Sequence, residues 1–204
     1  HEFKSDAVIT DPPYGETSLA WDKWPQGWPD VAALVTDALW CFGSVRMFFE
    51  NLHDFAAWKY SQEVVWEKHN GSSLANDRFR RVHEIAALWY RGNWADLRHV
   101  VPTTDDATAR TVRRKAKPAH HQGERGASIF TSVDGGPRLM RSVLKVRSEH
   151  GRAIHPTQKP VGIVNPLIEY SVPEGGRLID LYSGSASIAV AARQLGRRCI
   201  AFEA

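Results

Sequence analysis

The fold is decided by the stretch Leu178-Ile179-Asp180-Leu181-Tyr182-Ser183-Gly184-Ser185-Ala186-Ser187, which has the pattern of a buried strand, a tight loop of small residues and the start of a helix. Such a loop lets a ligand approach the backbone that larger side chains would cover. A second strand is predicted at 198–203, and it ends in Glu203, roughly 20 positions after Asp180. An acid at this spacing accepts hydrogen bonds from ribose hydroxyls in doubly wound nucleotide sites. The stretch therefore predicts a nucleotide-type site on an α/β scaffold.

The rest of the chain alternates between strand and helix patterns. Strands are predicted at 7–10, 44–49, 63–66, 83–90 and 177–181, and helices at 30–39, 51–56, 161–170 and 186–195. This alternation favours an α/β sandwich with a mostly parallel central sheet and helices on both faces. The pattern is interrupted between residues 91 and 153. We therefore expect one domain built from 1–90 and 154–204, with an inserted region at 91–153.

Composition narrows the function classes. The chain has 204 residues, of which 43% are hydrophobic and 24% charged, as in an ordinary globular domain. It shows neither an apolar run long enough to span a membrane nor an apolar leader, so the expected compartment is the cytoplasm. Two cysteines, Cys41 and Cys199, cannot build a disulfide scaffold or a four-ligand zinc site, and no metal is expected. A net charge of +3 permits a polyanionic partner without requiring one.

The tetrapeptide Asp11-Pro12-Pro13-Tyr14 has the most specific chemistry in the chain. Because prolines fix φ and lack N–H donors, the aspartate carboxylate and a proline carbonyl form a rigid pair of acceptors beside an aromatic ring. An exocyclic amino group can donate both of its hydrogens to these acceptors while its base stacks on Tyr14. The alternative is a proline turn that Asp11 simply caps. Since ligands of open parallel sheets bind where the strand order reverses, we expect Asp11 and Asp180 to meet at neighbouring strand ends.

In this order the motifs resemble those of DNA amino-methyltransferases of the permuted (β) class, in which the catalytic motif precedes the cofactor motif. Residues 11–14 match the catalytic tetrapeptide, residues 180–187 resemble the glycine-rich cofactor motif, and residues 155–160 (His-Pro-Thr-Gln-Lys-Pro) are close to a signature that lines the methionine end of the cofactor. The resemblance implies a Rossmann-like methyltransferase fold with S-adenosylmethionine as cofactor. The catalytic residues implied are Asp11, Pro12, Pro13 and Tyr14, and the cofactor-binding residues implied are Asp180, Tyr182, Ser183, Gly184, Ser185, Glu203, Thr157 and Lys159.

The cofactor motif departs from the family pattern. Leu181 and Tyr182 stand where the family usually has proline and phenylalanine, and Ala186 stands where it has a second loop glycine. The methyl group of Ala186 is expected to lower cofactor affinity, which leaves open a non-catalytic DNA-binding subunit with the same fold. The family also has an acidic, adenine-contacting segment before the catalytic strand. This segment is absent from the sequence, so we expect further residues at both ends.

The target base and the DNA contacts are predicted from the same resemblance. An aspartate at the first motif position favours adenine N6 over cytosine N4, although both stay open; ribosomal RNA guanine-N2 enzymes share the tetrapeptide but have the reverse motif order. We expect site-specific methylation of a base flipped out of double-stranded DNA by a bacterial or phage enzyme of the restriction–modification type, and members of this class often form a homodimer. Five basic residues, Arg110, Arg113, Arg114, Lys115 and Lys117, are expected to contact phosphates, with a solvated loop as the alternative.

Overall fold

The computed structural model describes residues 4–72, 76–116, 126–149 and 158–203. The chain divides into two compact units. The main unit comprises His1–Val100 and Arg141–Ala204, and the small unit comprises Val101–Met140. The small unit falls within the range 91–153 that the sequence sets apart, and it is shorter than that range at both ends.

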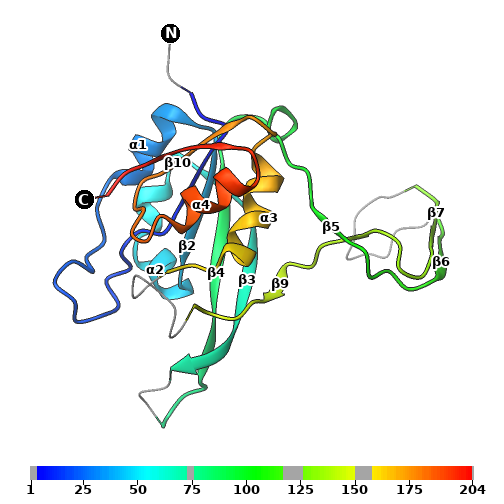
Figure 1. Ribbon diagram of the computed structural model, residues 1–204, viewed down its shortest axis with the longest axis horizontal. Coiled ribbons are helices and arrows are strands. Elements are labelled where there is room, and N and C mark those ends of the chain that lie inside the picture. Colours follow the sequence, from blue (N-terminus) through cyan, green and yellow to red (C-terminus); the bar gives the residue numbers. More distant parts are fainter. Residues whose placement is uncertain (1–3, 73–75, 117–125, 150–157, 204) are drawn as a thin grey trace. The chain divides into compact units, whose positions relative to one another are not determined.

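The main unit is built on a seven-stranded sheet (Figure 1). Its strands lie in the order β11 (Arg198–Ala201), β10 (Arg177–Asp180), β1 (Ala7–Thr10), β2 (Ala38–Gly43), β4 (Arg81–Tyr90), β3 (Lys59–Ser72) and β9 (Val143–Lys145). Only β4 among them runs antiparallel to its neighbours, so the sheet is mostly parallel, as the sequence predicts. The chain passes from β1 to β2 on one side and from β10 to β11 on the other. The strand order therefore reverses between β1 and β10.

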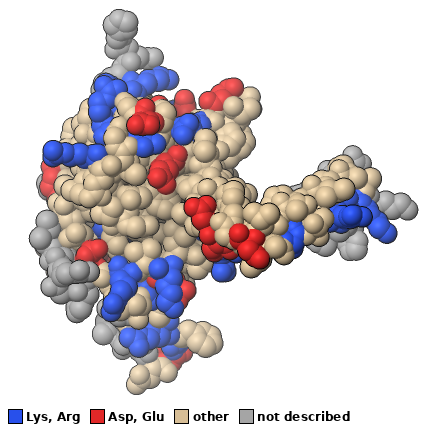
Figure 2. All heavy atoms as spheres, turned by 45° about the vertical axis from the view of Figure 1, so that its right-hand side comes forward, with Lys and Arg blue, Asp and Glu red and all other residues tan. Residues whose placement is uncertain are grey.

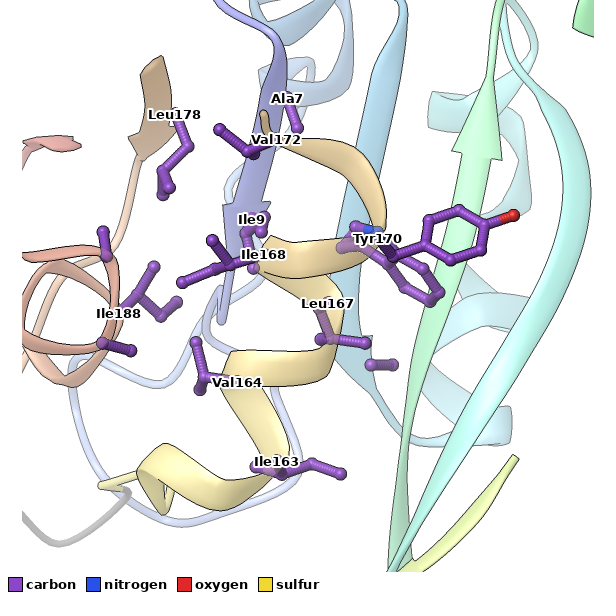
Figure 3. Packing of buried hydrophobic residues seen from close by; sticks show 14 of the residues in the cluster. Ala7, Ile9, Ile163, Val164, Leu167, Ile168, Tyr170, Val172, Leu178 and Ile188 are labelled. Carbon is purple, nitrogen blue, oxygen red and sulfur yellow. The ribbon is translucent and has the colours of Figure 1, made fainter. Parts of the chain in front are cut away.

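Helices cover both faces of this sheet, because successive strand residues point to opposite sides. Ile9 and Leu178 pack on the side of α3 (Val161–Ser171) and α4 (Ser187–Gln194), where Figure 3 shows them facing Ile168 and Ile188. Val8, Leu39 and Ile179 pack on the other side, against α1 (Trp28–Val35), α2 (Val45–Glu50) and the short helix η1 (Leu52–Phe55). Each fully buried aliphatic side chain contributes about 1.5–3 kcal/mol of transfer free energy. The two-sided core holds the central strands in place.

Two sequence predictions in this region are wrong. The helix expected at 30–39 ends at Val35, and the strand expected at 44–49 is instead the N-cap and most of α2. The strand is instead β2, whose residues Ala38–Gly43 are all buried. A strand buried on both faces has no polar alternation, so its apolar run could not be distinguished from the end of a helix. Ser44 marks the start of α2, since its hydroxyl accepts a hydrogen bond from the Met47 amide at 3.0 Å.

The small unit consists of two short antiparallel ladders. One pairs β6 (Arg110–Arg114) with β7 (Ser128–Ser132), and the other pairs β5 (Thr103–Thr104) with β8 (Arg138–Leu139). Ala107 is the one buried hydrophobic residue among those described in this unit, while Ile129 and Phe130 are exposed. The unit therefore has little core of its own. A further short helix, η2 (Trp94–Asp96), belongs to the main unit.

Candidate active site

Thr10 joins the two motifs at the carboxyl ends of β1 and β10. These strands pair in parallel with Val8 opposite Ile179, which places Asp11 and Asp180 at neighbouring strand ends, as the sequence predicts. The Thr10 hydroxyl donates to the Asp180 carboxylate at 2.9 Å and accepts from the amides of Leu181 and Tyr182 at 3.1 and 3.2 Å. The tetrapeptide at 11–14 and the small-residue loop are thus linked by this buried side chain as well as by strand pairing.

Asp180 is fully buried, and its pKa is raised to about 7. Burial is the main cause, and hydrogen bonds from Thr10 and from the Tyr182 amide act in the opposite direction. These bonds go to one carboxylate oxygen, whereas the other, Oδ2, has no hydrogen-bond partner within the described structure. Unpartnered buried carboxylate oxygens are rare, and a cationic group placed beside this one would stabilise its ionised form.

The loop after Asp180 is closed onto the end of β11. The Ser183 amide donates to the Phe202 carbonyl at 2.8 Å, and Glu203 accepts hydrogen bonds from the Gly184 amide at 2.5 Å and the Ser183 hydroxyl at 3.3 Å. Gly184 and Ala186 both have left-handed backbones, with φ of 46° and 57°. This conformation costs an L-residue about 1–2 kcal/mol, so Ala186 occupies a position that favours glycine.

Tyr182 and Ser185 are the other expected cofactor-binding residues of this loop. The Tyr182 ring packs edge-on against Trp28 with centroids 5.9 Å apart, which anchors the loop to α1. Ser185 is half-buried between Gly184 and Ala186. The residues expected to bind the cofactor therefore lie in the loop after β10 and just after β11, and they are Asp180, Tyr182, Ser183, Gly184, Ser185 and Glu203.

A largely buried network of charges holds the tetrapeptide at 11–14 in place. The Tyr14 hydroxyl donates to one Asp11 oxygen at 2.6 Å, and the Lys159 ammonium donates to the other at 2.6 Å. Lys159 is 4% exposed and lies 3.2 Å from a Glu84 oxygen, and Glu84 also pairs with Lys68. Two lysines and two carboxylates thus compensate one another, and only Lys159 among them is almost fully shielded from water. Ion pairs of this kind orient their members firmly, because loss of one partner leaves a buried charge uncompensated.

This network shifts the pKa of each member. Burial and the neighbouring Glu84 raise the pKa of Asp11 against the opposing effect of Lys159, and burial raises the pKa of Tyr14 well above its usual range. Burial acts to raise the pKa of Glu84, but Lys159 and Lys68 outweigh it and lower the value to about 2. Burial acts to lower the pKa of Lys159, but Asp11 and Glu84 raise it, so Lys159 stays an ammonium ion at neutral pH.

The remaining expected site residues are placed as follows. Lys159, expected at the methionine end of the cofactor, donates to Asp11. Thr157 and Lys117 fall outside the described residues. The other basic residues expected to contact DNA are exposed on or beside β6 of the small unit, and they are Arg110, Arg113, Arg114 and Lys115.

Thr10, Lys68 and Glu84 were missed by the sequence analysis as members of this site. Glu84 had a usable signal, since it is a charged residue at the start of the apolar run that forms β4.

Among the described residues, no three His, Cys, Asp or Glu side chains are placed to bind a metal ion. No helix in the described ranges is long and apolar enough to cross a membrane.

The fold is that of a Rossmann-like methyltransferase. A family model described as "DNA methylase", for N6 and N4 amino-methyltransferases, matches residues 5–204, and the chain belongs to that family. The chain is 31% identical over 128 residues to "Putative methylase YubD" of Escherichia coli (strain K12), a match that covers 61% of this chain and 52% of the relative. The chain therefore spans about half the length of this curated relative.

Solved structures share the fold at low sequence identity. The crystal structure of an M1.HpyAVI–SAM complex matches with a TM-score of 0.63 and 21% identity, covering 99% of this chain and 84% of that one. The PvuII DNA methyltransferase, which is cytosine-N4-specific, matches with a TM-score of 0.60 and 12% identity, covering 99% and 75%. At these low sequence identities, the similarity to the solved structures shows a shared fold.

Proposed function

We propose that this protein is an S-adenosylmethionine-dependent DNA methyltransferase that acts on the exocyclic N6 of a flipped-out adenine. The observation that carries the proposal is the junction at Thr10, which holds the ends of β1 and β10 together. A residue suited to orient an amine, Asp11, thereby lies at the strand end next to one suited to bind a cation, Asp180. Family membership supports a DNA substrate.

The residues at the end of β10 fit the proposed cofactor. The unpartnered buried oxygen of Asp180 suits the cationic amino and sulfonium end of S-adenosylmethionine, and the Glu203 carboxylate, with the loop from Tyr182 to Ser185, suits its ribose. When bound, the cofactor supplies an electrophilic methyl group. Thr157 and Lys159 of the preceding signature stay part of this proposal.

The tetrapeptide residues orient the target amine. Two acceptor positions of the Asp11 carboxylate are taken by Tyr14 and Lys159, and an ionised carboxylate has about two more for an amino group. The carbonyl of Pro12 takes the second amine hydrogen, Pro13 keeps the backbone rigid, and the Tyr14 ring stacks on the base. Lys159 and the Tyr14 hydroxyl are positioning groups, because they hold the Asp11 carboxylate in one orientation. An amine nucleophile attacks directly, so no covalent enzyme intermediate is needed.

The inserted region is proposed to recognise the DNA target. Arg110, Arg113, Arg114 and Lys115 present positive charge along and after β6, which suits contacts with phosphates, and Lys117 follows them in the sequence. In this proposal residues 1–90 and 154–204 carry out methylation, and residues 91–153 select the site.

Analysis of modified nucleosides tests the proposal. The full-length protein is incubated with isotope-labelled S-adenosylmethionine and unmodified DNA, and the digested DNA is analysed by mass spectrometry, with Asp11→Ala as the inactive control. Labelled N6-methyladenine is the expected product. Labelled N4-methylcytosine would instead identify a cytosine enzyme. A protein that neither binds the cofactor nor labels DNA would be a non-catalytic subunit, in line with the strained Ala186 in its loop.

A further inference from the structure

Strands β3 and β4 continue past the rest of the sheet as a two-stranded hairpin (Figure 1). The last pair between β4 and β2 is Ile85 with Gly43, and the last pair between β3 and β9 is Glu67 with Lys145. Ser72 still pairs with Arg81, after a shift in register. Within the described structure, the outer part of the hairpin is therefore flanked by no further strand.

The outer part of the hairpin is strongly basic. Residues 68–83 contain four Lys or Arg and one acid, an excess equal to the net charge of +3 of the whole chain. Figure 2 shows Lys and Arg side chains gathered at the lower end of the main unit, where the hairpin lies in Figure 1. We define the hairpin patch as Arg78, Phe79, Arg80 and Arg81, all of which are exposed.

The arginines of the hairpin patch differ in how they are held. Arg78 is 73% exposed and pairs with the adjacent Asp77, which is 68% exposed. Arg80 donates to the Gly71 carbonyl at 2.8 Å across the hairpin, and Arg81 donates to Glu16 at 3.0 Å. The Arg78–Asp77 pair is exposed on both sides, and such ion pairs contribute little free energy, so a phosphate could replace Asp77 as the partner of Arg78 at small cost.

Phe79 lies between these arginines and is 101% exposed, more than any other large hydrophobic residue described. A fully exposed aromatic ring contributes nothing to the core. Arginines that contact phosphates next to an aromatic ring that stacks on or wedges between bases are a recurring arrangement in nucleic-acid-binding proteins. The composition of the patch therefore fits a nucleic acid.

The patch is connected to the candidate active site through β4 and the tetrapeptide loop. Glu84 of β4 contacts Lys159, which contacts Asp11, and Arg81 pairs with Glu16, two residues after Tyr14. At about 3.3 Å per strand residue, Arg81 lies about 10 Å from Glu84 along the strand. About three base pairs of a duplex cover that distance, at roughly 3.4 Å per pair. The hairpin patch thus falls within reach of DNA flanking a base held at Asp11.

We propose that the hairpin patch binds duplex DNA beside the target base, with Arg78 and Arg80 contacting phosphates and Phe79 contacting the bases. This inference rests on the proposed function, since it takes DNA as the substrate. It adds a DNA-binding element in the main unit to the basic residues expected in the small unit.

The test is the salt dependence of binding to a short fluorescein-labelled duplex of mixed sequence, measured by fluorescence anisotropy with the full chain. Each lost phosphate contact reduces the slope of log K against log salt by about 0.9, so Arg78→Gln with Arg80→Gln should reduce it by about 2. Arg78→Lys with Arg80→Lys keeps the charge and should keep the slope. Phe79→Ala should weaken binding about five-fold or more at an unchanged slope. Phe79→Trp keeps an aromatic ring and should bind DNA as tightly as the wild type.

Arg193→Gln is the matched control. Arg193 is exposed in the last turn of α4, which leads to the start of β11. It therefore lies near the amino ends of the strands, whereas the candidate site lies at their carboxyl ends. This variant should bind like the wild type, and thermal melting should show that every variant folds. A wild-type slope for the glutamine pair would overturn the inference while leaving the methyltransferase proposal intact. Failure of the wild-type protein to bind or methylate any duplex would overturn both.

Discussion

The hydroxyl of Thr10 donates a 2.9 Å hydrogen bond to the buried carboxylate of Asp180, joining two residues that are 170 positions apart in the sequence. The same oxygen accepts hydrogen bonds from the amides of Leu181 and Tyr182. A hydroxyl has one donor and two acceptor lone pairs, so the capacity of Thr10 is fully used. The spatial relation between the two motifs therefore depends on this side chain as well as on strand pairing.

Thr10→Val should separate these two contributions. The substitution keeps the shape of a β-branched strand residue, but it leaves the Leu181 amide without its partner and removes one of the two hydrogen bonds to Asp180 Oδ1. An unsatisfied buried group costs about 1–3 kcal/mol. Chemical denaturation should show a loss of stability, and calorimetric titration should show weaker binding of S-adenosylmethionine. Thr10→Ser retains the hydroxyl and should preserve most of the affinity. Equal affinity for the valine variant and the wild type would contradict the assigned role.

Asp180→Asn should stabilise the protein at alkaline pH. Because the pKa of Asp180 is about 7 in the folded state and near 3.8 when solvated, folding favours the protonated form. The resulting stability is fully present below about pH 4 and is lost as pH rises through 7. The variant, which cannot ionise, should be more stable than the wild type by about 4 kcal/mol at pH 8, with little difference at pH 4. Urea unfolding at the two pH values measures this.

The same variant should bind S-adenosylmethionine poorly. Affinity of the wild type should increase as pH rises from 6 to 8, because only the ionised carboxylate attracts a cation. Asp180→Asn should lack that dependence. A wild-type pH profile in the variant would show that Asp180 does not face the cationic end of the ligand.

Asp11→Ala should lose turnover and keep cofactor binding. Asp11 contacts Tyr14 and Lys159, whereas the residues at the end of β10 form a separate group of contacts. Removal of an oriented acceptor of the reacting group should lower the rate about 100-fold or more. Methyl transfer to DNA and calorimetric titration with S-adenosylmethionine measure the two effects separately. Asp96→Ala, at an exposed acid of η2, is the control and should leave both unchanged.

Lys159→Met should affect both folding and the pH profile. The variant leaves Asp11 and Glu84 buried without their shared ammonium, and loss of one partner from a buried ion pair costs about 3–5 kcal/mol. Adding Glu84→Gln removes one of the two carboxylates and should restore part of the stability. In the double variant the pKa of Asp11 should be higher than in the wild type, so the acidic limb of the rate profile should move to higher pH. An unmoved limb would mean that Lys159 acts only on stability.

Ala186→Gly should stabilise the chain by about 0.5–1 kcal/mol. Glycine adopts the left-handed conformation of residue 186 without the strain of a Cβ atom, although it loses more chain entropy on folding. Ala189→Gly, inside α4, should have the opposite effect by about 1 kcal/mol. Thermal unfolding compares the two glycine variants, and destabilisation by both would show that the loop carries no strain.

A structural feature of this protein is predictable from its sequence when the interactions that form it join residues close together in the chain. Strand β1 and the strand–loop–helix around Asp180 follow from local patterns, since proline, glycine and a buried apolar run determine where those elements begin and end. Strand β2 was placed wrongly, because burial on both faces removes the polar alternation that marks a strand. The ion pairs of Lys159 were also not predictable, because its ammonium group pairs with Asp11, which follows β1, and with Glu84 of β4, both far from it in the sequence.

The sequence by itself determined the family, the mostly parallel sheet and the two motifs that end its central strands. The tertiary structure alone decided which groups surround those motifs. Thr10 links the loop to the strand that precedes the tetrapeptide, and Lys159 joins Asp11 to Glu84, which also pairs with Lys68. It also decided that β3 and β4 extend past the other strands as a basic hairpin. The physical reason is that strand and turn preferences act between near neighbours in the chain. Hydrogen bonds and ion pairs in a buried site join residues from several strands, and only the folded arrangement of those strands brings them within reach.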